Sequence, residues 1–90
     1  MIDPLIFEAE LGEEARDFVK SQLGIFIIEQ CKQDRQIALE KLADVDPEDL
    51  SATRNAINEV KLAERFEQKL VQIIQQGDSA LAAWKQQEQQ

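Results

Sequence analysis

The stretch SQLGIFIIEQC, residues 21–31, contains four consecutive large apolar residues, Ile25-Phe26-Ile27-Ile28. Successive side chains of an α-helix lie about 100° apart, so these four point in four different directions. A helix that packs on one neighbour buries a single stripe, and at least one of the four therefore needs a second cover. In a chain of only 90 residues, that cover can come from another chain.

The remainder of the sequence predicts an all-α fold. Glycine and proline are rare, helix-forming residues dominate, and β-branched runs are missing. Asp3-Pro4 and Asp46-Pro47 are typical helix starts, because Asp caps the first turn and Pro is preorganised for it. The sequence therefore indicates a helix after each of these pairs.

We expect helices over residues 4–20, 21–45 and 47–76. Ser21 is a candidate cap of the second helix, in which Gly24 is a weak point, and Gly77 is a candidate left-handed residue at the end of the third. Asp78 or Ser79 would then start a short extension over 79–86. The short connection before Pro47 implies an antiparallel helical hairpin with a shorter N-terminal helix. We expect one helical domain over residues 1–84 and a flexible Gln-rich tail over 85–90.

Each long helix carries two apolar stripes. The first stripes, which we expect to form the hairpin seam, are Ile27, Ile28, Cys31, Ala38, Leu39, Leu42 and Val45, and Ala56, Ile57, Val60, Ala63, Leu70 and Ile74. The second stripes are Leu23, Phe26 and Ile37, and Leu62, Phe66 and Ile73, continued by Ala80 and Trp84. The first helix offers only one stripe to cover them, consisting of Phe7, Leu11, Ala15 and Phe18.

One narrow stripe covers one leftover patch well but not both, so we predict that oligomerisation completes the fold. The candidate interface is Leu23, Phe26, Ile37, Leu62, Phe66, Ile73 and Trp84. Two interpretations of Trp84 stay open. It packs in the core on Phe66 or Ile73, or it is an exposed anchor for a partner, since Trp is enriched at interface hot spots.

The net charge of −8, the single cysteine and the lack of histidine exclude several functions. The excess of acidic residues argues against direct binding of nucleic acid and permits a basic protein partner. One cysteine allows no disulfide within the chain, and Cys31 is expected to act as a small hydrophobe. We see no signal peptide and no apolar run long enough for a membrane span, so we expect a location in the cytoplasm or in a particle made there.

Glu10, Glu13, Glu14 and Asp17 share one helical face and form a candidate acidic face. Helical carboxylate metal sites normally add a histidine, which this chain lacks, so we interpret the face as solvated. The segment DVDPED, residues 44–49, lacks the glycine and closing glutamate of a calcium loop and is expected to be a helix-capping turn. We expect no catalytic residue, metal, cofactor or small-molecule substrate, and the chain is not expected to be an enzyme.

The segments FEAELGEEARDFVKSQLG, LADVDPEDLSATRNAINEVKLAERFEQKL and IQQGDSA, in this order, span most of the chain. Together they resemble small helical proteins of tailed bacteriophages and prophages, of unassigned function, encoded near head and packaging genes. The resemblance implies a role in virion assembly or an accessory phage role, and it implies no catalytic residue.

The sequence thus favours a non-enzymatic phage structural or interaction protein that self-associates, or docks on a phage protein, through apolar helix faces. The alternative is an acidic decoy or inhibitor that binds a basic host protein. Added salt distinguishes the two, because it screens exposed charges and barely affects apolar docking.

Overall fold

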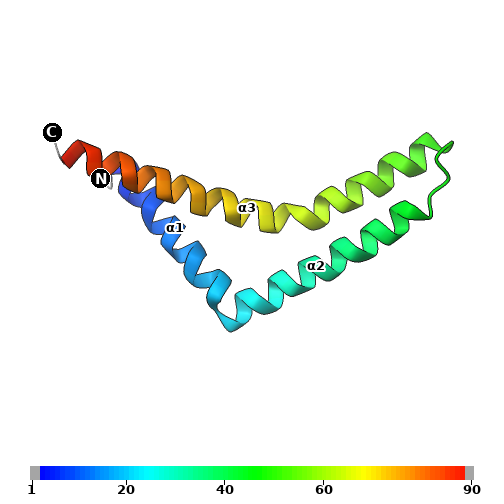
Figure 1. Ribbon diagram of the computed structural model, residues 1–90, viewed down its shortest axis with the longest axis horizontal. Coiled ribbons are helices and arrows are strands. Elements are labelled where there is room, and N and C mark those ends of the chain that lie inside the picture. Colours follow the sequence, from blue (N-terminus) through cyan, green and yellow to red (C-terminus); the bar gives the residue numbers. More distant parts are fainter. Residues whose placement is uncertain (1–2, 89–90) are drawn as a thin grey trace. The chain divides into compact units, whose positions relative to one another are not determined.

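The computed structural model describes residues 3–88, and all the regular secondary structure in that range is α-helical (Figure 1). The helices are α1 (Pro4–Lys20), α2 (Gln22–Ala43) and α3 (Leu50–Glu88). Since no strand occurs between residues 3 and 88, the prediction of an all-α fold is confirmed.

Helix α1 begins where the sequence predicts. The carboxylate of Asp3 accepts a hydrogen bond of 2.9 Å from the backbone N–H of Leu5. Pro4 occupies the first turn, where a missing N–H costs no intrahelical hydrogen bond. The two residues together fix the start of the helix.

Ser21 joins α1 to α2. Its backbone N–H and its hydroxyl donate to the carbonyl oxygen of Phe18 at 3.0 and 2.6 Å, and its hydroxyl oxygen accepts from the N–H of Gly24 at 2.9 Å. The prediction that Ser21 caps the second helix is confirmed. A Cβ on Gly24 would lie 1.6 Å from the Phe18 carbonyl oxygen, so the turn needs glycine there. Gly24 is thus a requirement of the turn rather than a weak point of α2.

The connection between α2 and α3 is longer than predicted, because α2 ends at Ala43 and α3 begins at Leu50. Asp46 starts a turn instead of a helix. Its carboxylate accepts from the N–H of Glu48 and its carbonyl from the N–H of Asp49, both at 3.0 Å. Asp followed by Pro suits the first two positions of such a turn as well as it suits a helix start. The helix cap is Asp49, whose carboxylate accepts from the N–H of Ala52 at 3.0 Å.

Helix α3 continues through the residue that was predicted to end it. Gly77 lies inside α3, and no glycine between residues 3 and 88 has a positive φ. The predicted break at Gly77 and the separate extension over 79–86 are therefore wrong. Residues 85–88 of the predicted flexible tail are also helical, which agrees with the helix-forming character of Lys, Gln and Glu. Residues 89 and 90 lie outside the described range.

The chain divides into two compact units. Unit 1 joins the residues up to Ile25, which include α1, with those from Lys69 onward in α3. Unit 2 is Phe26–Gln68 and contains most of α2 and the first part of α3. The single domain predicted over residues 1–84 stays a prediction.

Unit 2 is a pair of antiparallel helical segments (Figure 1). The Arg35 guanidinium donates to the carboxylate of Glu64 at 2.7 Å, and the ammonium of Lys41 lies 3.9 Å from the carboxylate of Glu59. The partner number in α3 falls as the number in α2 rises, which defines the antiparallel direction. All four side chains are solvent-accessible, so these pairs contribute little stability each and mainly favour this register.

Alanine forms the buried part of the seam in unit 2. Ala38 and Ala56 are the buried apolar side chains there. The large residues of the predicted seam in this unit are half-buried, except Ile57, which is exposed. Small residues at a helix contact let two helices approach closely, but they leave the larger side chains at the margins.

Unit 1 is held together where α1 and α3 approach at two glycines. A Cβ on Gly77 would lie 2.8 Å from the Cα of Gly12 and 3.0 Å from the carbonyl oxygen of Glu8. A Cβ on Gly12 would lie 2.9 Å from the Cα of Gly77. Atoms of a real side chain do not fit at these distances, so the close approach requires glycine at both positions.

The predicted apolar stripe of α1 is therefore wrong in part. Phe7 is 49% exposed and Leu11 is also exposed, whereas the buried residues of α1 are Gly12 and Ala15. The contact with α3 follows the small residues, because they allow the backbones to approach. Ala80 of α3 is buried in the same unit.

Candidate functional site

Most residues of the predicted interface are exposed. Leu23 and Phe26 are each 61% exposed, Ile37 is 52%, Leu62 is 64% and Phe66 is 39% exposed. The other two, Ile73 and Trp84, are half-buried. Large apolar side chains exposed to this degree gain stability when another surface covers them. Their role as an interface stays a prediction.

Ile37 and Leu62 come together in unit 2. Both line a groove of about 400 Å³ between α2 and α3, together with Ala38 and Ala63. Ala38 is buried and Ala63 is half-buried, whereas Ile37 and Leu62, which directly precede them, are exposed and flank the seam. The lining is completed by Asp34, Lys41 and Glu59.

A second groove of unit 2 is lined only by polar side chains. They are Lys32, Arg35, Gln36, Glu64, Glu67 and Gln68. The helix pair of unit 2 thus has one groove with an apolar centre and one polar groove. Isoleucine, leucine and alanine side chains line the first of these two grooves and are absent from the lining of the second.

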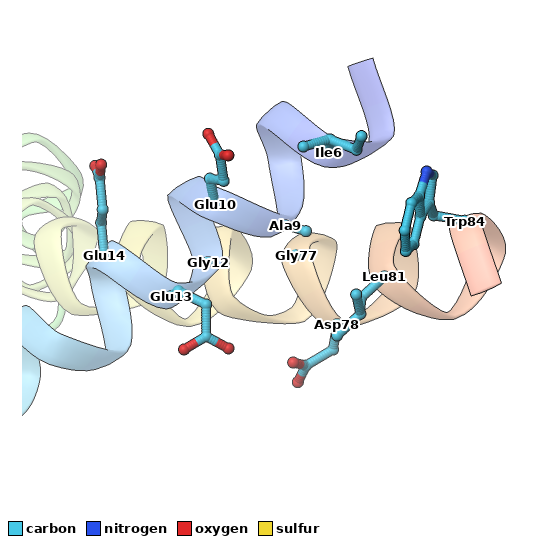
Figure 2. Close-up of a pocket in the computed structure, with 10 residues that line it drawn as sticks. All are labelled: Ile6, Ala9, Glu10, Gly12, Glu13, Glu14, Gly77, Asp78, Leu81 and Trp84. Atoms are coloured by element: carbon cyan, nitrogen blue, oxygen red, sulfur yellow. The ribbon is translucent and has the colours of Figure 1, made fainter. Parts of the chain in front are cut away.

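Unit 1 contains a cavity of about 460 Å³ between α1 and α3, hereafter the unit 1 cavity (Figure 2). Its lining consists of Ile6, Ala9, Glu10, Gly12, Glu13, Glu14, Gly77, Asp78, Leu81 and Trp84. Gly12 and Gly77, where the two helices approach most closely, form part of this lining.

Every charged residue that lines the unit 1 cavity is acidic. Glu10 and Glu14 point to one side of α1, and Glu13 and Asp78 point to the other (Figure 2). Asp78 accepts a hydrogen bond of 2.6 Å from the Arg16 guanidinium, which raises the pKa of Arg16. This pair joins α1 to α3 and neutralises only one of the four carboxylates.

Three residues of the predicted acidic face therefore lie at the cavity, while Asp17 is not part of its lining. All four of these acidic residues are exposed. Part of the acidic face lies beside the apolar lining of the cavity, because α1 contacts α3 through its small residues.

Trp84 lines the unit 1 cavity with Ile6 of α1. The predicted packing on Ile73 is wrong, since α3 is continuous and Ile73 lies eleven residues earlier, ~16 Å along the helix axis. The predicted packing of Trp84 on Phe66 is wrong for the same reason, since Phe66 precedes Ile73 in α3 and lies still further from Trp84. The half-buried Trp84 keeps part of its ring accessible from the cavity.

The sequence interpretation missed Gly12 and Gly77 as contact residues. A signal was present: Ala9, Gly12 and Ala15 recur at intervals of three residues, as do Gly77 and Ala80. Such spacing places small residues along one helix face. It does not show which helix will pack on that face.

The described residues include no group of three or more His, Cys, Asp or Glu that could hold a metal ion. Cys31 is half-buried; burial, together with Glu67 and Asp34, raises the pKa of its thiol. A raised pKa keeps the thiol protonated and makes it a poor nucleophile. None of the helices between residues 3 and 88 is long and apolar enough to cross a membrane.

Comparison of the chain with known protein families, with curated proteins and with solved structures finds no match.

Proposed function

We propose that this chain is a non-enzymatic interaction protein that self-associates, or docks on another protein, through its apolar helix faces. The observation that carries the proposal is the burial pattern. Every buried apolar side chain between residues 3 and 88 is an alanine, and no side chain there is fully buried. The large apolar residues are left partly or mostly in water.

Chains of this size bury a smaller fraction of their surface than larger domains do, and they are marginally stable without a disulfide, a metal or a partner. Full burial of one Leu, Ile or Phe side chain stabilises a protein by about 1.5–3 kcal/mol. A partner surface that covers a few of the exposed side chains would supply the stability that the alanine seams do not. We place the main contact on the groove of unit 2 flanked by Ile37 and Leu62.

The resemblance to small helical proteins of tailed bacteriophages supports a place in virion assembly. Assembly proteins act by contact and need no catalytic group. The negative charge at the unit 1 cavity supports a second kind of contact, with a partner of positive charge.

The test is the molar mass in solution, measured by light scattering over a range of protein concentrations. We expect a dimer or larger assembly, which the double variant Ile37→Asp, Leu62→Asp dissociates. The matched control is Gln36→Asp, Gln68→Asp, which adds the same charge to the polar groove of unit 2 and should leave the mass unchanged. A 10.3 kDa monomer at every concentration would refute self-association.

A further inference from the structure

We infer that the unit 1 cavity binds a basic segment of a partner protein, which inserts one apolar side chain flanked by lysine or arginine. The inference rests on the proposed role as an interaction protein and names the chemistry of one partner. It involves residues of unit 1 alone, so it can be tested separately from self-association.

The apolar part of the cavity is formed by Ile6, Ala9, Leu81 and Trp84. Figure 2 shows Ile6 on α1 and Trp84 on α3 at its margin. Leu81 is also exposed, so an inserted apolar side chain would remove both aliphatic and aromatic surface from water. The face of an indole ring also attracts a nearby lysine or arginine side chain.

The negative charge of the cavity favours a partner with positive charge. Its four charged residues are all carboxylates, and Arg16 forms an ion pair with Asp78 and a weaker electrostatic interaction with Glu13. No ion pair within residues 3–88 involves Glu10 or Glu14. Because the carboxylates project to both sides of α1, a bound segment meets negative charge on either side of its apolar residue (Figure 2).

A basic protein segment fits this surface better than the other possible occupants. A second copy of this chain carries a net charge of −8, so overall charge repulsion opposes its approach to the four carboxylates. Nucleic acid would bring phosphates against carboxylates. Charge complementarity therefore favours a protein partner with clustered lysine or arginine.

Trp84 makes the binding directly observable. It is the only tryptophan, and the chain has no tyrosine, so the emission of the intact protein reports on the cavity. The probe is a short amphipathic peptide of leucine and lysine. Two peptides of the same length serve as controls, one with serine in place of leucine and one with glutamate in place of lysine.

We expect a saturable change in Trp84 emission with the leucine-lysine peptide and none with either control. The triple variant Glu10→Gln, Glu13→Gln, Glu14→Gln should lower the affinity about 10-fold, because each exposed ion pair contributes a few-fold. The matched control removes three charges from positions outside the cavity lining, as Glu29→Gln, Glu40→Gln, Asp44→Asn, and should bind as the parent does. Added salt should weaken binding by the parent.

Three results would overturn the inference. The first is no response to the leucine-lysine peptide, and the second is an equal response to the serine-lysine peptide, which would show charge attraction without insertion. The third is an emission that changes with the concentration of the protein alone, which would assign the cavity to a second copy. Failure of the proposed self-association would appear instead in the molar mass, with the peptide response unchanged.

Discussion

Substitution of Gly77 by alanine tests the close approach of α1 and α3, because two effects of opposite sign compete at this position. In an exposed helix interior, Gly→Ala stabilises by about 1 kcal/mol through helix propensity. Here the new Cβ would lie 2.8 Å from the Cα of Gly12, about 1 Å inside the optimal carbon–carbon distance. It would also lie 3.0 Å from the carbonyl oxygen of Glu8, so both neighbouring atoms belong to the backbone.

Backbone atoms cannot rotate away as a flexible side chain does, so α1 has to shift as a whole. Overpacking of this kind costs about 1–3 kcal/mol. After the gain in helix propensity is subtracted, we expect Gly77→Ala to lower the free energy of unfolding by about 1 kcal/mol. In a domain of this size, that loss lowers Tm by about 4–8 °C.

The assay is thermal and denaturant unfolding followed by circular dichroism, at one fixed protein concentration because association changes apparent stability. The matched control is Ser79→Ala, an exposed position two residues further along α3 that should gain a few tenths of a kcal/mol from propensity alone. If Gly77→Ala stabilises the protein as an exposed substitution would, the two helices do not approach at these glycines.

The remaining predictions concern the connection before α3 and the cysteine. Asp49→Ala should lower the free energy of unfolding by about 1 kcal/mol because it removes the helix cap, whereas Asp44→Ala should leave it nearly unchanged; denaturant unfolding measures both. Because the pKa of the Cys31 thiol is raised, its thiolate fraction at mildly alkaline pH is low, and a chromogenic disulfide should react more slowly with it than with free cysteine. Glu67→Gln removes one cause of the shift and should speed this reaction, while an unchanged rate would contradict the assigned cause. The raised pKa also implies that the contribution of the protonated thiol to stability, present below its ordinary pKa, is lost as pH rises through the folded-state value.

The sequence predicted the features that depend on local chemistry. Asp3 before Pro4 starts α1, and Ser21 caps α2, because a side-chain oxygen close in sequence meets the free N–H groups of the first turn. Local chemistry did not show whether Asp46 or Asp49 caps α3, since both can accept such hydrogen bonds. Both do so, Asp46 in the turn and Asp49 at the start of the helix.

The features that depend on a second helix were not predictable in this way. A glycine between polar residues late in a helix is typical of a helix end, and it is equally suitable where another backbone approaches. Gly77 has the second role, which becomes evident only when Gly12, far away in the sequence, lies against it. The positions of the carboxylates at the unit 1 cavity have the same origin, because the small residues of α1 determine which face meets α3.

The small residues at the contacts and the large residues in water are two consequences of one arrangement. In unit 2 the buried Ala38 allows close approach of the helices, and the neighbouring Ile37 is then placed at the margin of the seam. In unit 1 the same holds for Gly12 and the exposed Leu11. Close contact through alanine and glycine buries little apolar area per residue, so the exposed large side chains leave further hydrophobic stabilisation for contacts outside the seams. A fold of this kind therefore gains stability when a partner covers its exposed apolar side chains. The grooves beside its seams are where we expect a partner to bind.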